Sequence, residues 1–260
     1  MSAAARLPSW RRGTLALGLL GAVLLIAWQF GLPSAAHVAP WPHEPGGLHL
    51  VADQSWDRLG GQWKLLWGTA RIDSMPNAPG SPPSVLRIDF PAGFIGGSAP
   101  GTEAITFRSS RTVYAGFWWM ASDPWDGHPS NSNKLAYIFA EPHGSMSLMM
   151  YGTPGGPYEL RVFPDWHGEW LRPNIAEIPV TLGVWHRIEW LVIEGSPGDP
   201  AGGIVRWWLD GTLVGSHTGV RLAEGPMTEF RLAPVWGGAE PVPKQTSDHF
   251  FFDHTRLSVR

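Results

Sequence analysis

The 260-residue chain is long enough for one large domain or two small ones, and we expect one because all-β domains commonly occupy this range. A hydrophobic fraction of 43% with 12% aromatic residues excludes disorder of the whole chain. A formal charge of −3 argues against nucleic acid as a partner, and the absence of cysteine excludes disulfides, thiolate catalysis and cysteine-ligated metals.

The N-terminal region predicts a membrane anchor. Residues 14–32 carry no charge, and a helix of this length approaches the roughly 30 Å thickness of the bilayer core. Arg6, Arg11 and Arg12 precede this stretch, and no Lys or Arg follows until Arg58, which places the N-terminus inside. We therefore expect a cytoplasmic segment over residues 1–13, a transmembrane signal anchor over 14–32 and an extracytoplasmic remainder.

A cleaved signal peptide is the alternative to a retained anchor. Ser34, Ala35 and Ala36 form a small-residue cleavage site, although the apolar run exceeds the usual length of about 7 to 15 residues. The Pro-rich stretch over residues 33–47 predicts a spacer, and residues 48–260 predict the folded domain, which is periplasmic or extracellular in both cases.

Short apolar or alternating runs, bounded by Gly, Pro, Asn and Asp, predict β-strands throughout this domain. They span residues 85–90, 112–120, 134–139, 146–151, 158–163, 185–193, 204–209, 212–214, 230–232 and 250–259. Asp210-Gly211 lies between two of these runs and predicts a two-residue type I′ hairpin. Without a repeat of fixed period, an antiparallel jelly-roll sandwich is the simplest way to close such a sheet.

The two-residue period of a strand sorts side chains by face. Val205, Trp207 and Leu209 fall on one side and predict core positions, whereas Arg206 and Trp208 fall on the other. One face of the sheet is thus expected to mix charged and aromatic side chains.

Several C-terminal segments carry a resemblance to a known superfamily. A strand opens with Gly-x-Trp, a hairpin turns through Trp-x-Asp-Gly, and a closing strand follows. These features, over residues 183–190, 203–211, 234–238 and 251–254, with 125–130 and 133–135 upstream, resemble the concanavalin A-like lectin/glucanase superfamily, in particular its polysaccharide-lyase-like bacterial members. The resemblance covers residues 84–260 and implies a jelly-roll β-sandwich, but it is weakly specific for function.

A sugar-binding surface needs flat aromatic faces and fixed polar groups. The candidate residues for such a face are Arg87, Tyr151, Arg161, Arg206, Trp208 and Trp236. The alternative is that the Trp residues are core and that the Arg residues pair with Glu159 or Asp89 on an exposed sheet.

Catalysis has weaker support in the sequence. A uronate lyase needs a base and a cation, and His128, His143, Tyr151 and Lys134 are of suitable type, but their spacing does not show that they converge. The paired carboxylates of a retaining glycosidase are missing. We expect no cofactor and no metal site among the scattered histidines, and a structural calcium ion stays open.

Three functions follow from these features. We expect a membrane-tethered domain that recognises a glycan without catalysis. One alternative is a non-catalytic accessory subunit of a membrane protein complex, held by its single helix. The other is a polysaccharide lyase acting on a uronate polymer.

Overall fold

The computed structural model describes residues 41–165, 167–196, 198–222, 225–238 and 240–260. These residues form two stacked antiparallel sheets, sheet A and sheet B. The all-β class and the jelly-roll sandwich are therefore confirmed. The predicted anchor over residues 14–32 lies outside the described residues, and within them no helix is long and apolar enough to cross a membrane.

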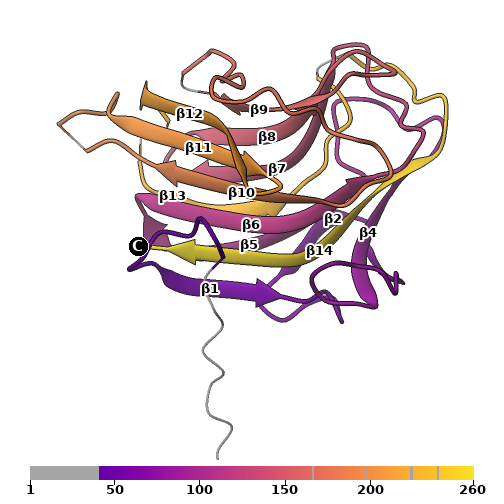
Figure 1. Cartoon of the computed structure of the whole chain (residues 1–260), viewed down its shortest axis with the longest axis horizontal. Coiled ribbons are helices and arrows are strands. Elements are labelled where there is room, and N and C mark those ends of the chain that lie inside the picture. The colour runs from indigo at the N-terminus through magenta and orange to yellow at the C-terminus, as the bar shows by residue number, and fades with distance from the viewer. Residues whose placement is uncertain (1–40, 166, 197, 223–224, 239) are drawn as a thin grey trace, which may run out of the picture. The chain divides into compact units, whose positions relative to one another are not determined.

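Sheet A is the larger sheet, with eight strands in the described chain. Its strand order is β12-β11-β10-β6-β14-β4-β3, and β1 also pairs with β14, so that β14 lies between β6 and β1 in Figure 1. The strands are β1 (His49–Gln54), β3 (Arg71–Ser74), β4 (Ser84–Phe90), β6 (Thr112–Ala121), β10 (His186–Ile193), β11 (Gly203–Leu209), β12 (Thr212–Val220) and β14 (Asp248–Val259).

Sheet B has six strands in the described chain, in the order β2-β5-β13-β7-β8-β9. The strands are β2 (Lys64–Gly68), β5 (Gly101–Ser110), β7 (Ser132–Ala140), β8 (Ser145–Tyr151), β9 (Glu159–Pro164) and β13 (Met227–Leu232). The edge strand β2 is exposed along its whole length. All ten predicted strand regions are present, whereas β1, β2, β3 and β5 were not predicted.

The core lies between the two sheets and is built from alternate residues of their strands. Val205, Trp207 and Leu209 of β11 are fully buried, as their period predicts, and Arg206 between them is partly exposed. The predicted hairpin is also confirmed, because Asp210 and Gly211 have φ angles of 52° and 84°. The aromatic-rich composition thus supplies the interior of the sandwich.

The described part of the predicted spacer packs on the domain. The Glu44 carboxylate accepts hydrogen bonds from Arg256 at 2.5 and 3.2 Å and from Ser258 at 2.5 Å, both on β14. His43 binds the buried Glu189 carboxylate of β10 through its backbone N–H at 2.9 Å and its ring Nδ1 at 3.0 Å. Residues 41–47 therefore form a strap across sheet A.

Candidate functional site

The face of sheet B that points away from the core carries polar and aromatic side chains in rows across its strands. One row joins Lys134 of β7, Met149 of β8 and Arg161 of β9. Residues directly opposite in antiparallel strands share a face, so these three side chains point the same way. We call this surface the sheet B face.

A β-bulge in β7 adds a further functional side chain to the sheet B face. The pairing register shifts between Lys134 and Ala136, and Leu135 is fully buried as the extra residue. Without the bulge, Lys134 and Tyr137 would point to opposite sides, because they are three residues apart. With it, both side chains line the same cavity.

That cavity has a volume of about 360 Å³ and lies over β7, β8 and β9. Its lining is a mixture of hydroxyl, aromatic and charged groups, namely Ser130, Ser132, Lys134, Tyr137, Ser147, Met149, Phe163, Asp165, Trp170 and Gly238. The Lys134 ammonium group donates a hydrogen bond to the Gly237 carbonyl at 3.2 Å. The cavity therefore holds one lysine whose position is fixed by the backbone.

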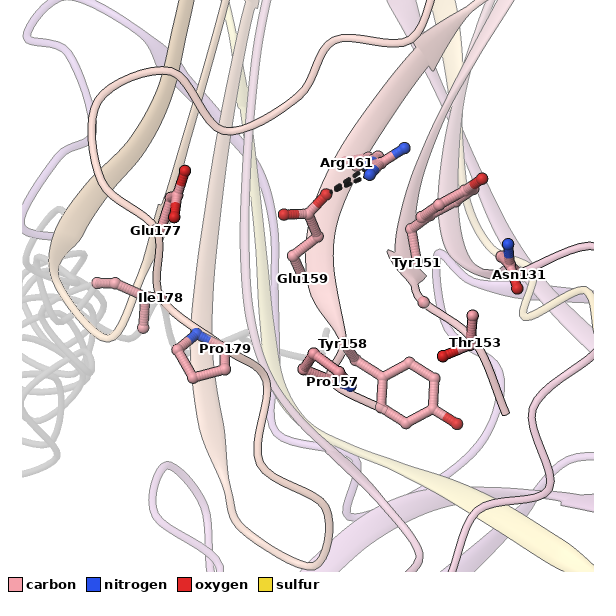
Figure 2. A pocket seen from close by; sticks show the side chains of 11 residues that line it. Asn131, Tyr151, Thr153, Pro157, Tyr158, Glu159, Arg161, Glu177, Ile178 and Pro179 are labelled. Carbon is pink, nitrogen blue, oxygen red and sulfur yellow. Dashed lines mark hydrogen bonds and ion pairs between the residues drawn. The ribbon is translucent and has the colours of Figure 1, made fainter. Parts of the chain in front are cut away.

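A second cavity of about 530 Å³ adjoins the first along the same strands. Figure 2 shows Tyr151 and Arg161 on its wall, with Glu159 bound to Arg161. The Arg161 guanidinium lies 3.7 Å from the centre of the Tyr151 ring, which is a cation–π contact. An aromatic face and a cation are thus presented side by side.

Trp170 lines the first cavity and contacts Tyr151, which lines the second. Its ring centroid is 5.1 Å from that of Tyr151 and 4.8 Å from that of Phe163, and the side chain is partly exposed. On the other side of Tyr137, Arg231 of β13 lies 4.0 Å from the Phe139 ring centre and pairs with Glu229 at 2.8 Å. The sheet B face therefore offers aromatic and cationic groups on both sides of Lys134.

Burial shifts the pKa values of the two titratable groups at the centre in opposite directions. Burial lowers the pKa of Lys134, while the nearby charge of Asp165 acts in the opposite direction. Burial also raises the pKa of Tyr137, assisted by Asp165 and opposed by Arg231. Burial thus makes the amine of Lys134 easier to deprotonate and the phenol of Tyr137 harder to deprotonate than the exposed groups.

Of the six predicted glycan-binding residues, the structure brings together Tyr151 and Arg161. Arg206 and Trp208 lie on β11 in sheet A, where Trp208 is 8% exposed and stacks on His43 at 4.9 Å. Trp236 is buried, and its indole N–H donates to the Asp126 carbonyl at 2.7 Å.

Arg87 belongs to sheet A as well. It lies on β4 and pairs with Asp89 at 2.7 Å. The expectation of one shared face was wrong for these four residues. Arg87, Arg206 and Trp208 lie in the other sheet, because a two-residue period sorts the faces of one strand but does not say which sheet the strand joins, and Trp236 is buried. The alternative ion pairs, Arg87 with Asp89 and Arg161 with Glu159, both form.

The residues considered for lyase chemistry also separate. Lys134 and Tyr151 lie on the sheet B face, but His128 is fully buried and bonded to Ser130 at 2.8 Å. His143 lines a third cavity with Phe139 and Asp165. Tyr137 was not singled out from the sequence, because the bulge that turns it outward leaves no signal in the residue pattern. In the described ranges, no group of three or more His, Asp or Glu side chains is placed to hold a metal ion.

No protein-family model and no curated protein sequence matches the chain. Solved structures do match. The alginate lyase Aly36B, in complex with an alginate trisaccharide, matches with a TM-score of 0.55 at 12% identity, over 68% of this chain and 82% of that one. The matching structures include several lyases of alginate or glucuronan.

Two further lyases show the same fold. The alginate lyase vAL-1 from Chlorella virus has a TM-score of 0.54 at 12% identity and covers 82% of this chain and 100% of its own. The endo-β-1,4-glucuronan lyase from the fungus Trichoderma reesei has a TM-score of 0.52 at 18% identity, over 79% and 91%. The concanavalin A-like resemblance is confirmed, and at these identities it establishes the fold alone.

Proposed function

We propose that this protein is a polysaccharide lyase that binds a uronate polymer along the sheet B face and cleaves it by β-elimination. The observation that carries the proposal is the placement of Lys134 and Tyr137 in one cavity, on a fold shared with lyases of alginate and glucuronan. A lyase needs a base, an acid and a cation near the carboxylate, and this face contains all three.

Lys134 is the base in this mechanism. Its neutral amine removes the proton on the carbon next to the uronate carboxylate, and the electron pair forms a double bond as the glycosidic carbon–oxygen bond breaks. Because burial lowers the pKa of Lys134, the neutral amine is more available than in an exposed lysine. This is the usual way in which a lysine becomes a general base near neutral pH.

Tyr137 and the arginines supply the remaining roles. The phenol of Tyr137, kept protonated by its raised pKa, donates a proton to the leaving oxygen. Arg161 lies two strands from Lys134, roughly 10 Å across the sheet, and stabilises the negative charge that develops on the carboxylate. Tyr151 and Trp170 offer flat faces to neighbouring sugar rings.

The test is incubation of the full chain with alginate and glucuronan, followed by detection of unsaturated uronate products. Lys134→Met should lower the rate by at least about 100-fold, as expected for loss of a general base. Lys64→Met is the matched control, because Lys64 lies on the exposed strand β2, three strands from β7 in the sheet. A wild-type protein that binds these polymers but releases no unsaturated product would overturn the lyase assignment.

Glycan recognition without catalysis is the second candidate. It is favoured by the pairing of the cations on the sheet B face, since Arg161 is bound to Glu159 and Lys134 to the Gly237 carbonyl. Binding that persists in Lys134→Met with no turnover in either protein would support it.

We also propose that residues 14–32 anchor the chain, with the sandwich on the outer side of the membrane. The uncharged stretch and the arginines before it support this location. The test is protease treatment of cells. The domain should be protected in intact cells and cleaved once the outer face of the membrane is made accessible. A domain that stays protected under both conditions would contradict it.

A further inference from the structure

A buried lysine on the loop before β14 has no role in the chemistry above. Lys244 is 2% exposed, and its ammonium group lies 4.3 Å from the Trp125 ring centre and 4.7 Å from that of Trp236. It pairs with Asp248 at 2.6 Å and donates to the Asp126 carbonyl at 2.5 Å. A buried cation held this way is costly to form unless each contact is made, so the loops around it are tightly specified.

These contacts join two loops that end at the site. The Asp126 backbone N–H donates to Asp248 at 2.8 Å, and its carbonyl accepts from the Trp236 indole at 2.7 Å as well as from Lys244. Trp236 in turn packs edge-on against His128, with ring centroids 4.7 Å apart. The buried cation, the two loops and the histidine form one connected cluster.

The cluster ends at the carbonyl that binds Lys134. Gly237 follows Trp236 directly and has a φ angle of 87°, and a Cβ there would lie 2.2 Å from a ring carbon of His128. The Gly237 N–H donates to the Ser132 carbonyl at 2.9 Å, which joins this turn to β7. Its own carbonyl accepts the hydrogen bond from the Lys134 ammonium group.

We propose that Lys244 is a positioning residue that, through Trp236, holds the Gly237 carbonyl in place and thereby fixes the amine of Lys134 in its cavity. The catalytic consequence rests on the proposed function, but the positioning itself does not. When the buried cation is removed, Asp248 and the Asp126 carbonyl lose a partner, the turn loosens, and water reaches Lys134. Its pKa then moves up toward that of an exposed lysine, because desolvation is what holds it down. Asp165, the charged neighbour that acts on Lys134, is unchanged.

The chain has three lysines, Lys64, Lys134 and Lys244, so side-chain NMR of isotopically labelled lysine follows each of them separately. In Lys244→Met, the titration midpoint of Lys134 should rise toward that of Lys64. The matched control Lys64→Met should leave it unchanged. A folded Lys244→Met protein with an unshifted Lys134 midpoint would overturn the proposal.

Trp236→Phe keeps the buried cation and an aromatic ring but removes the indole hydrogen bond to Asp126. It should shift the Lys134 midpoint in the same direction by a smaller amount. If Lys244→Met does not fold, Trp236→Phe takes its place as the test. An unshifted Lys134 midpoint in Trp236→Phe would then count against the proposal. If the wild type cleaves uronate polymers, Lys244→Met should lower kcat more than it changes KM. If the wild type is inert, the lyase assignment fails while the titration still decides the positioning role.

Discussion

At the residue scale, Glu103 is the least satisfied charged group among the described residues. It lies on β5, is fully buried, and neither of its carboxylate oxygens has a hydrogen-bond partner. Its cross-strand partner on β13 is the buried Leu232, so no compensating cation is supplied there. Desolvation accordingly raises the pKa of Glu103.

Glu103→Gln should stabilise the protein at neutral and alkaline pH. Because the pKa of Glu103 is raised in the folded state, its contribution to stability is fully present below the unfolded pKa, where the carboxyl is protonated. That contribution is lost as pH rises through the folded pKa. Gln cannot ionise, so the variant does not lose stability in this way. Its free energy of unfolding should exceed that of the wild type by an amount that grows with pH, to an order of 1–3 kcal/mol. Chemical denaturation across pH measures it, with the exposed Glu169→Gln as control. An advantage that is constant with pH, or a less stable variant, would contradict the assignment.

Single residues also show how far the sequence predicts the site. Tyr151 and Arg161 could be selected because residue type and strand period are both local properties. Tyr137 could not, because its orientation depends on the bulge at Leu135, which appears only when β7 pairs with β8. Trp208 and Trp236 were of suitable type, but Trp208 packs on His43 and Trp236 binds the Asp126 carbonyl, and both partners are distant in the chain.

At the element scale, the β11–β12 hairpin depends on Asp210. Its carboxylate accepts hydrogen bonds from the Arg187 N–H and from the His186 ring, both at 2.7 Å. Burial opposes ionisation, but these hydrogen bonds outweigh it and hold the pKa of Asp210 below its usual value. The turn residue therefore also connects the hairpin to β10.

Asp210→Ala should destabilise the protein at neutral pH. The side chain is 45% exposed, so water screens its interactions and the expected loss of unfolding free energy is about 1 kcal/mol. Because folding lowers the pKa of Asp210, its carboxylate stabilises the folded state above the unfolded pKa, and this stability is lost as pH falls through the folded pKa. The difference in unfolding free energy between Asp210→Ala and wild type should therefore shrink in acid. Urea denaturation at neutral and acidic pH tests this, with Asp57→Ala at an exposed carboxylate as control. If the difference in unfolding free energy between Asp210→Ala and wild type widens in acid, the pKa of Asp210 is not lowered by folding.

The strands that the sequence missed are those that depend most on their neighbours. In β2, all five residues are exposed, and Leu65, Leu66 and Trp67 follow one another directly, so no alternation of apolar and polar residues marks it. In β5, Thr106, Arg108 and Ser109 are exposed, and its buried half contains Glu103. Such segments become strands because an adjacent strand offers backbone partners, which local propensity does not record.

At the scale of the whole molecule, the strap joins the start of the described chain to its last strand. Arg256 and Glu44 are each 4% exposed at the side chain, and Arg256 also lies 3.6 Å from Asp53. On sheet A, the strap is separated from the sheet B face by the core. Interactions of the strap should therefore affect stability and leave ligand binding unchanged.

Glu44→Ala should destabilise the whole domain, because it leaves the buried Arg256 guanidinium without its closest partner. Loss of one member of a buried ion pair typically costs about 3–5 kcal/mol, and the remaining contact with Asp53 places the expected value at the lower end. Thermal and urea unfolding measure the loss, and Glu169→Ala, at a carboxylate that is 82% exposed, is the control. Affinity for a uronate polymer, measured well below the melting temperature, should match wild type. Equal stability of Glu44→Ala and wild type would mean that residues 41–47 are a spacer resting on the domain, whereas a loss of several kcal/mol makes them part of the fold.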